Sequence, residues 1–121
     1  MIKVKRAYDT PGKQDGYRVL GDRIWPRGLK KEEAVIDRWL KEVAPSTELR
    51  RWFGHESKKW PEFCKRYAAE LENKTDAIQF LLEQGRNGTL TLIYAARNTE
   101  HNNAVALKRF LESSLTGGSR E

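Results

Sequence analysis

The amino-acid sequence predicts an α/β fold, in which a single compact domain holds a small, mainly parallel sheet flanked by helices. Its 121 residues are a normal length for one domain with its own core. Strand-like segments alternate with helix-like segments along the chain, which is typical of this fold class. The segment 89–96, "TLTLIYAA", is apolar on both faces and suits a central strand that is covered on both sides. We assign residues 1–115 to the domain and residues 116–121 to a flexible polar tail.

Two strands are predicted in the first part of the chain. In residues 2–8, apolar side chains alternate with lysines, which is the period-two pattern of a half-buried strand near a sheet edge. Residues 9–16 contain one proline and two glycines, so the chain turns there. Residues 17–24 form a second strand, which brings Asp22 and Arg23 close to its end.

The segment 32–44 has two interpretations. Its apolar residues fall at helical spacing, which predicts one buried face of a helix. These residues are Val35, Ile36, Trp39, Leu40 and Val43. A strand over residues 36–42 is the alternative. Pro45 disfavours helical geometry at Ala44, so a helix would end there.

Helices dominate the rest of the chain. Ser46 is a good N-cap for a short helix that ends at Gly54. A clear amphipathic helix follows, whose apolar face comprises Trp60, Phe63, Cys64, Tyr67, Ala68 and Leu71. Thr75 is expected to cap the next helix, with Gly85 just past its end. After the central strand, a last helix faces inward with Ala104, Leu107, Leu111 and Leu115.

Composition excludes several classes of protein. The longest apolar runs are about five residues, far below the ~20 needed to cross a bilayer, so no membrane span is expected. The one cysteine, Cys64, cannot form an internal disulfide, and no signal peptide is recognisable, which favours the reducing cytoplasm. His55 and Cys64 lack a second cysteine, so we expect no metal site.

The positive charge lies in the first half of the chain. The net charge of +6 is carried by residues 1–60, where 15 Lys and Arg residues stand against 9 Asp and Glu. All four tryptophans lie there too. Cations attract phosphate and aromatic rings offer stacking faces, so this half indicates an anion-binding or nucleic-acid-binding surface. Because tryptophan also suits a core and lysine suits any helix surface, a purely structural interpretation stays open.

Ligands of open parallel sheets bind at the carboxyl ends of the strands, and two loops qualify here. The first loop is "DRIWPRG", residues 22–28. In it, Asp22 is a candidate carboxylate partner, Arg23 and Arg27 are forks for phosphate or carboxylate, and Trp25 is a stacking wall. In the structural alternative, Trp25 plugs the end of the sheet and Asp22 pairs with a nearby arginine.

The second loop is "ARNTEHNN", residues 96–103, which opens a helix after the central strand. Free backbone N–H groups and the helix dipole favour an anion there, and Arg97 adds to that preference. His101 is an acid–base candidate, and Asn102 and Asn103 are expected to orient a ligand. The alternative, which we favour on the residue types alone, is that Thr99, His101 and Asn102 only cap the helix and its neighbours.

Four motifs carry a family resemblance: "DRIWPRG", "APS" followed by "LRRWFGH", "RYAAEL" and "YAARNTEHNNA". Together they resemble the YeaO-like family of small uncharacterised bacterial proteins, and the resemblance covers nearly the whole chain. It implies a single α/β domain and assigns no function. The wider superfamily often carries a cysteine-histidine-arginine segment where this sequence has "EHNN", so thiol chemistry does not transfer to this chain.

These residues lead to one hypothesis and two rivals. We expect the two loops to form a cationic pocket for a phosphorylated or carboxylated small molecule, with Asp22 and His101 as candidate acid and base. Hydrolysis or group transfer without a cofactor would suit this equipment, although binding is favoured over catalysis. The first rival is a nucleic-acid-binding or regulatory module that uses Lys30, Lys31, Arg50, Arg51, Lys58 and Lys59. The second rival is a protein-interaction domain with exposed tryptophans as anchors, and the oligomeric state stays open.

Overall fold

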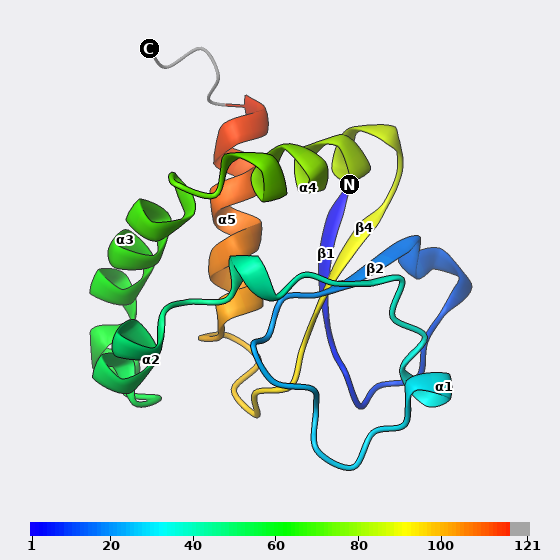
Figure 1. The fold of residues 1–121 in the computed structure, drawn as a ribbon, viewed down its shortest axis with the longest axis horizontal. Coiled ribbons are helices and arrows are strands. Elements are labelled where there is room, and N and C mark those ends of the chain that lie inside the picture. Colours follow the sequence, from blue (N-terminus) through cyan, green and yellow to red (C-terminus); the bar gives the residue numbers. More distant parts are fainter. Residues whose placement is uncertain (117–121) are drawn as a thin grey trace.

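The computed structural model describes residues 1–116 and shows a single α/β domain (Figure 1). Its strands are β1 (Ile2–Arg6), β2 (Tyr17–Leu20), β3 (Arg38–Trp39) and β4 (Leu90–Tyr94). Its helices are α1 (Lys31–Ala34), α2 (Thr47–Phe53), α3 (Trp60–Leu71), α4 (Thr75–Asn87) and α5 (Asn103–Thr116). The strands form one parallel sheet in the order β1-β4-β2-β3, which confirms the predicted fold class. The tail predicted for residues 116–121 lies outside the described residues, except for Thr116 at the end of α5.

β4 lies in the middle of the sheet, as its apolar sequence predicts. All five residues of β1 pair with it on one side, and all four residues of β2 pair with it on the other. Every residue of β4 is buried, because other elements cover both of its faces. β1 and β3 are the edge strands, so the edge position expected for the first strand is confirmed.

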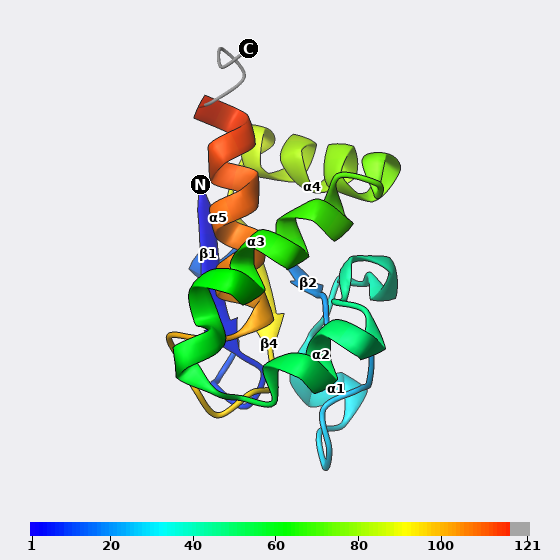
Figure 2. The ribbon, with the colours of Figure 1, turned by 90° about the vertical axis from the view of Figure 1, so that its left-hand side faces the viewer.

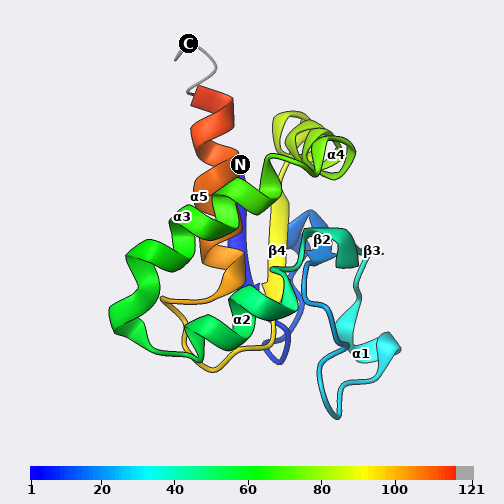
Figure 3. The ribbon, with the colours of Figure 1, turned by 60° about the vertical axis from the view of Figure 1, so that its left-hand side comes forward.

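The long helices pack on one face of the sheet. Figure 3 shows α2, α3 and α5 on one side of β4 and α1 on the other, and Figure 2 shows α5 running beside β1. The main core lies between these helices, α4 and the sheet, and its fully buried members include Val19, Leu90, Leu92, Tyr67, Leu81 and Leu111. Each large apolar side chain buried there contributes roughly 1.5–3 kcal/mol. The phenol of Tyr67 donates its hydrogen bond to the carbonyl of Val43, so its polar end is satisfied inside the core.

The opposite face of the sheet has a thinner cover. Its small apolar cluster consists of Ala7, Leu20 and Ile93, with Trp25, Leu29, Ile36 and Trp39 packed against it. The covering side chains all come from the segment 25–39, so the stretches before and after the short α1, together with the edge strand β3, cover this face in place of a layer of helices.

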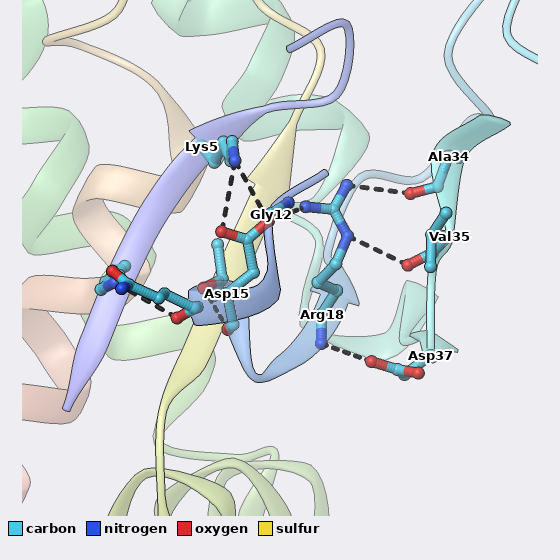
Figure 4. Close-up of polar contacts among 10 residues, drawn as sticks. Lys5, Gly12, Asp15, Arg18, Ala34, Val35 and Asp37 are labelled. Carbon is cyan, nitrogen blue, oxygen red and sulfur yellow. Dashed lines mark hydrogen bonds and ion pairs between the residues drawn. The ribbon is translucent and has the colours of Figure 1, made fainter. Parts of the chain in front are cut away.

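A buried ionic network on this thinner face joins β2 to the end of α1 (Figure 4). The exposed fraction of Arg18 is 3% and that of Asp15 is 6%. The guanidinium of Arg18 donates to the Asp15 carboxylate and to the carbonyls of Ala34 (2.9 Å) and Val35 (3.0 Å). Each of its three nitrogens therefore has a partner, and the Asp15 carboxylate compensates the buried charge.

Asp15 is held in its ionised form by several donors. The amide of Gly12 donates to it at 3.0 Å, and the Lys5 ammonium at 3.1 Å. Burial alone would raise the pKa of this carboxyl, but the hydrogen bonds from Gly12, Lys5 and Arg18 and the charge of Lys5 outweigh it and lower the pKa.

The helix predicted over residues 32–44 is wrong beyond Ala34. α1 ends after one turn because Val35 adopts the left-handed conformation, with φ 48° and ψ 52°. The chain then pairs with β2 as β3, so the strand alternative for residues 36–42 is the closer interpretation. The apolar spacing misleads because its members face different clusters: Ile36 and Trp39 pack on the thinner face, whereas Leu40 and Val43 enter the main core.

Two other predicted boundaries also differ. β2 ends at Leu20, four residues earlier than expected, and Gly21 passes so close to Val43 that a Cβ would come within 3.2 Å of it. Thr75 is the first residue of α4 and not its cap, and the helix continues through Gly85 to Asn87. Gly85 is buried against β1, where a larger residue would meet the side chain at the strand's start.

The short helix predicted after Ser46 is confirmed as α2. The Ser46 hydroxyl accepts a hydrogen bond from the Leu49 amide at 3.1 Å, and Gly54 ends the helix with φ 53°. None of the helices within residues 1–116 has the length and apolar character to cross a membrane.

Candidate functional site

The two candidate loops meet at the carboxyl ends of β2 and β4, at the lower end of the sheet in Figure 1. Together with α2 and the residues beside it, they line one cavity of about 680 Å³. Parallel strands place their following loops at the same edge of a sheet, which explains why residues far apart in sequence come together. The cavity therefore lies where this fold class commonly binds ligands.

Asp22 joins the two loops at this edge. Its Oδ2 accepts a hydrogen bond from the Ala95 amide at 3.0 Å, and its Oδ1 accepts one from Asn103 Nδ2 at 3.0 Å. Its backbone carbonyl accepts the Trp39 indole N–H at 2.8 Å. Burial raises the pKa of Asp22, although the hydrogen bonds from Asn103 and Ala95 and the charge of Arg50 act against that shift.

Four arginines lie at the exposed rim of the cavity: Arg23, Arg27, Arg50 and Arg51. Arg23 donates to the Thr47 hydroxyl at 2.9 Å, and Arg50 is close enough to Asp22 to influence its titration. Within residues 1–116, the guanidinium groups of Arg27 and Arg51 make no hydrogen bond or ion pair. Their donors are free to hold an anion.

Trp25 is half-buried and belongs to the cavity wall and to the thinner core at the same time. Its indole N–H donates to the Leu29 carbonyl at 2.6 Å, which fixes the ring within its own loop. Its ring packs edge-on against Trp39, with centroids 5.4 Å apart. Trp25 thus braces the sheet end, as in the structural alternative, while also lining the cavity.

His101 lines the cavity from the second loop. Its ring stacks on Trp60, with centroids 4.8 Å apart, and its Nδ1 lies 2.9 Å from the Ser57 hydroxyl. The loop before α5 therefore packs against the start of α3, and this contact fixes the orientation of the imidazole.

Asn102 and Asn103 have separate tasks. Asn102 is buried; its Oδ1 caps α5 by accepting the Val105 amide at 2.9 Å, and its Nδ2 donates to the Asn98 carbonyl at 2.8 Å. The capping alternative thus accounts for the side chain of Asn102, whereas Asn103 points to Asp22. Arg97 is exposed and takes no part in the cavity wall.

The contribution of α2 to the cavity was not among the features predicted from the sequence. Three α2 residues line it, Arg50, Arg51 and Phe53, as do Tyr8, Pro45, His55 and Phe63 outside that helix. This position depends on a contact between separate elements, because α2 reaches the cavity by packing on α3, where the rings of Phe53 and Phe63 are 4.6 Å apart. The motif "LRRWFGH" was the available signal, since it contains the two arginines and His55.

The remaining candidate ligands and nucleophiles are the His, Cys, Asp and Glu side chains of the described residues. Residues 1–116 contain no group of three or more His, Cys, Asp or Glu side chains that would hold a metal ion. Cys64 lies half-buried on α3, and burial raises the pKa of its thiol, although Arg109 opposes the shift.

Comparison with known proteins places this chain in a family. It is 43% identical over 112 residues to the uncharacterized protein YeaO of Escherichia coli, a match that covers 93% of this chain and 97% of that protein. It is 36% identical over 110 residues to uncharacterized proteins of Mycobacterium bovis and Mycobacterium tuberculosis, covering 91% of this chain and 92% of theirs. No solved structure matches the chain. A family model described as the inactive DUF488-N3 subclade matches residues 1–120, and the chain therefore belongs to that subclade as a YeaO-like domain of unknown function.

Proposed function

We propose that this protein binds a small organic anion in the cavity between the two loops, without catalysing its conversion. The observation that carries the proposal is the rim of four arginines, in which Arg27 and Arg51 have guanidinium groups without a partner among the described residues. Arginine donors in a fixed fork suit phosphate and carboxylate, so an anion would supply the missing acceptors. Trp25 forms part of the wall beside them.

Several observations favour binding over hydrolysis or group transfer. Both carboxylate oxygens of Asp22 already accept hydrogen bonds that hold the two loops together. The ring of His101 is stacked on Trp60, and one of its nitrogens contacts Ser57. The subclade to which the chain belongs is also described as inactive. In this proposal Asp22 and His101 organise the cavity and do not transfer protons.

The proposal is tested by isothermal titration with ribose 5-phosphate and with inorganic phosphate, at low and at moderate salt. The double variant Arg27→Met/Arg51→Met should bind ribose 5-phosphate at least about 10-fold more weakly, because two charge-assisted contacts are removed. The matched control is Lys65→Met/Arg86→Met, which removes the same charge from exposed positions of α3 and α4 that do not line the cavity. It should bind as the wild type does.

Two outcomes would overturn the proposal. One is the absence of binding by either anion at low salt. The other is an equal loss in both double variants, which would show a general charge effect. Binding of long polynucleotides alone, with an affinity that falls steeply with salt, would instead support the rival nucleic-acid surface.

A further inference from the structure

The cavity has a different chemistry at its rim and at its floor. The arginines of the rim are exposed, whereas the apolar residues Pro26, Pro45, Phe53 and Phe63 are buried. Half-buried Trp25 continues this apolar surface toward the opening. An inorganic anion would use only the rim and leave the apolar floor in contact with water. The floor therefore favours a ligand with an apolar, ring-shaped part.

The charge of Asp22 favours one orientation of such a ligand in the cavity. Its carboxylate is half-buried in the cavity wall and would repel an anionic group placed beside it. The anion is therefore expected at the rim, with the uncharged part inside. An ionised carboxylate offers about four lone-pair positions, and hydrogen bonds from Ala95 and Asn103 occupy two of them. The remaining positions suit an N–H donor on the ligand.

The size of the cavity agrees with a ligand of this kind. Its volume of about 680 Å³ falls within the range of ~300–1,000 Å³ that holds typical small-molecule ligands and cofactors. A phosphate, a sugar and one planar base together belong to the size class of ligand that such a cavity holds, whereas a free phosphate would occupy a small part of it.

Resting on the proposed function, we propose that the ligand is a nucleotide, with its phosphate at the arginine rim, its base against Trp25 and the apolar floor, and an N–H of the base donating to Asp22. Bases stack on aromatic side chains, and carboxylates accept hydrogen bonds from base amines. The phosphate is held by arginine side chains, since the sequence has neither of the glycine-rich phosphate loops. The same chemistry is offered by a free nucleotide and by one nucleotide of a single strand.

The first test compares ligands on the wild-type protein by isothermal titration. Adenosine monophosphate should bind at least about 10-fold more tightly than ribose 5-phosphate, which carries the same phosphate without a base. Adenosine, which lacks the phosphate, should bind more weakly than the monophosphate. The monophosphates of guanosine, cytidine and uridine, titrated in parallel, should each also bind more tightly than ribose 5-phosphate.

Two variants locate the base. In Trp25→Leu, the affinity for adenosine monophosphate should fall to nearly that for ribose 5-phosphate, so that the ratio of these two affinities is near one. The matched control Trp52→Leu should leave this ratio unchanged. Trp52 is half-buried in α2, contacts Lys59 and Arg66, and does not line the cavity. Asp22→Asn should weaken adenosine monophosphate more than ribose 5-phosphate. Ratios within one variant are compared, so a change in overall stability does not decide the result.

The outcomes separate this inference from the proposed function. Equal affinity for ribose 5-phosphate and all four monophosphates would overturn the nucleotide and leave anion binding intact. Binding of none of these ligands would overturn both. With the nucleotide supported, a tetranucleotide that binds over 10-fold more tightly than the monophosphate identifies a single strand as the source. Equal affinities for the tetranucleotide and the monophosphate identify the free nucleotide as the source.

Discussion

The Lys5–Asp15–Arg18 network and the cavity at the carboxyl edge are both built from basic side chains around an aspartate. Only in the network do all the charged side chains find their hydrogen-bond and ion-pair partners within residues 1–116. Every guanidinium nitrogen of Arg18 donates to an acceptor inside the protein. At the cavity rim, Arg27 and Arg51 lack such partners among the described residues. Burial demands partners from within the fold, whereas exposure at a cavity leaves donors for something outside it. The same residue types therefore stabilise the fold in one region and indicate binding in the other.

The largest expected effect on stability follows from breaking the Lys5–Asp15–Arg18 network. Asp15→Asn removes the negative charge beside buried Arg18 and should lower the free energy of unfolding by about 3–5 kcal/mol. Urea denaturation followed by circular dichroism measures this. Asp9→Asn, at an exposed turn, is the control and should change stability by less than about 0.5 kcal/mol. A similarly small change for Asp15→Asn would mean that the network does not stabilise the fold.

Acid titration should separate the two aspartates by the sign of their effect. The lowered pKa of Asp15 means that its carboxylate stabilises the folded protein above the ordinary pKa of about 4 and loses this effect as the pH falls further. The stability advantage of the wild type over Asp15→Asn should therefore shrink in acid. Thermal unfolding at a series of pH values measures it, and an advantage that grows in acid would contradict the assignment.

Asp22 should show the opposite trend. Because its pKa is raised, the folded protein binds this proton more tightly than the unfolded chain does, and the stability gained from protonation is lost as the pH rises through the raised pKa. The stability of the wild type relative to Asp22→Asn should therefore increase as the pH falls. The same series of unfolding curves tests this, and parallel behaviour of the two aspartates would remove the contrast.

A smaller effect is expected at the border between cavity and core. Asn102→Ala removes the cap of α5 and should lower the free energy of unfolding by about 1 kcal/mol. Urea denaturation measures it, with the exposed Asn73→Ala as control. No loss of stability would show that Asn102 is not needed as a cap, and its role in ligand binding would then gain weight.

The smallest effect on stability is expected at the rim. Arg51→Met should change the free energy of unfolding by less than about 0.5 kcal/mol, because the guanidinium has no partner in the described structure. It should still weaken ribose 5-phosphate binding several-fold in isothermal titration. A large loss of stability would place Arg51 with Arg18 as a structural residue and erase the distinction between the two regions.

The sequence predicts most elements because their signals are local. The spacing of Trp60, Phe63, Tyr67 and Leu71 fits one helical face, and all four are buried in α3. The doubly apolar segment around β4 likewise predicts its central place. The segment after Ala34 could not be predicted in this way, because its apolar residues are divided between two clusters on opposite faces of the sheet.

The site is only partly predictable for a related reason. Topology places the loops after β2 and β4 at one edge, so the joining of Asp22 to the second loop follows from the parallel sheet. The positions of Arg50 and Arg51 depend on how α2 packs against α3, which is a contact between separate elements. Arg97, although it belongs to the second loop, is exposed and does not line the cavity.

The strand order has a consequence for biosynthesis. β1 and β2 leave the ribosome early, yet they are not neighbours in the sheet, because β4 lies between them. Neither can form its main backbone pairing until residues 90–94 have been made. A nascent chain that stops before that point exposes the apolar faces of its first strands and offers them to chaperones or to other nascent chains. We therefore expect this domain to fold late in its synthesis, after its central strand has left the ribosome.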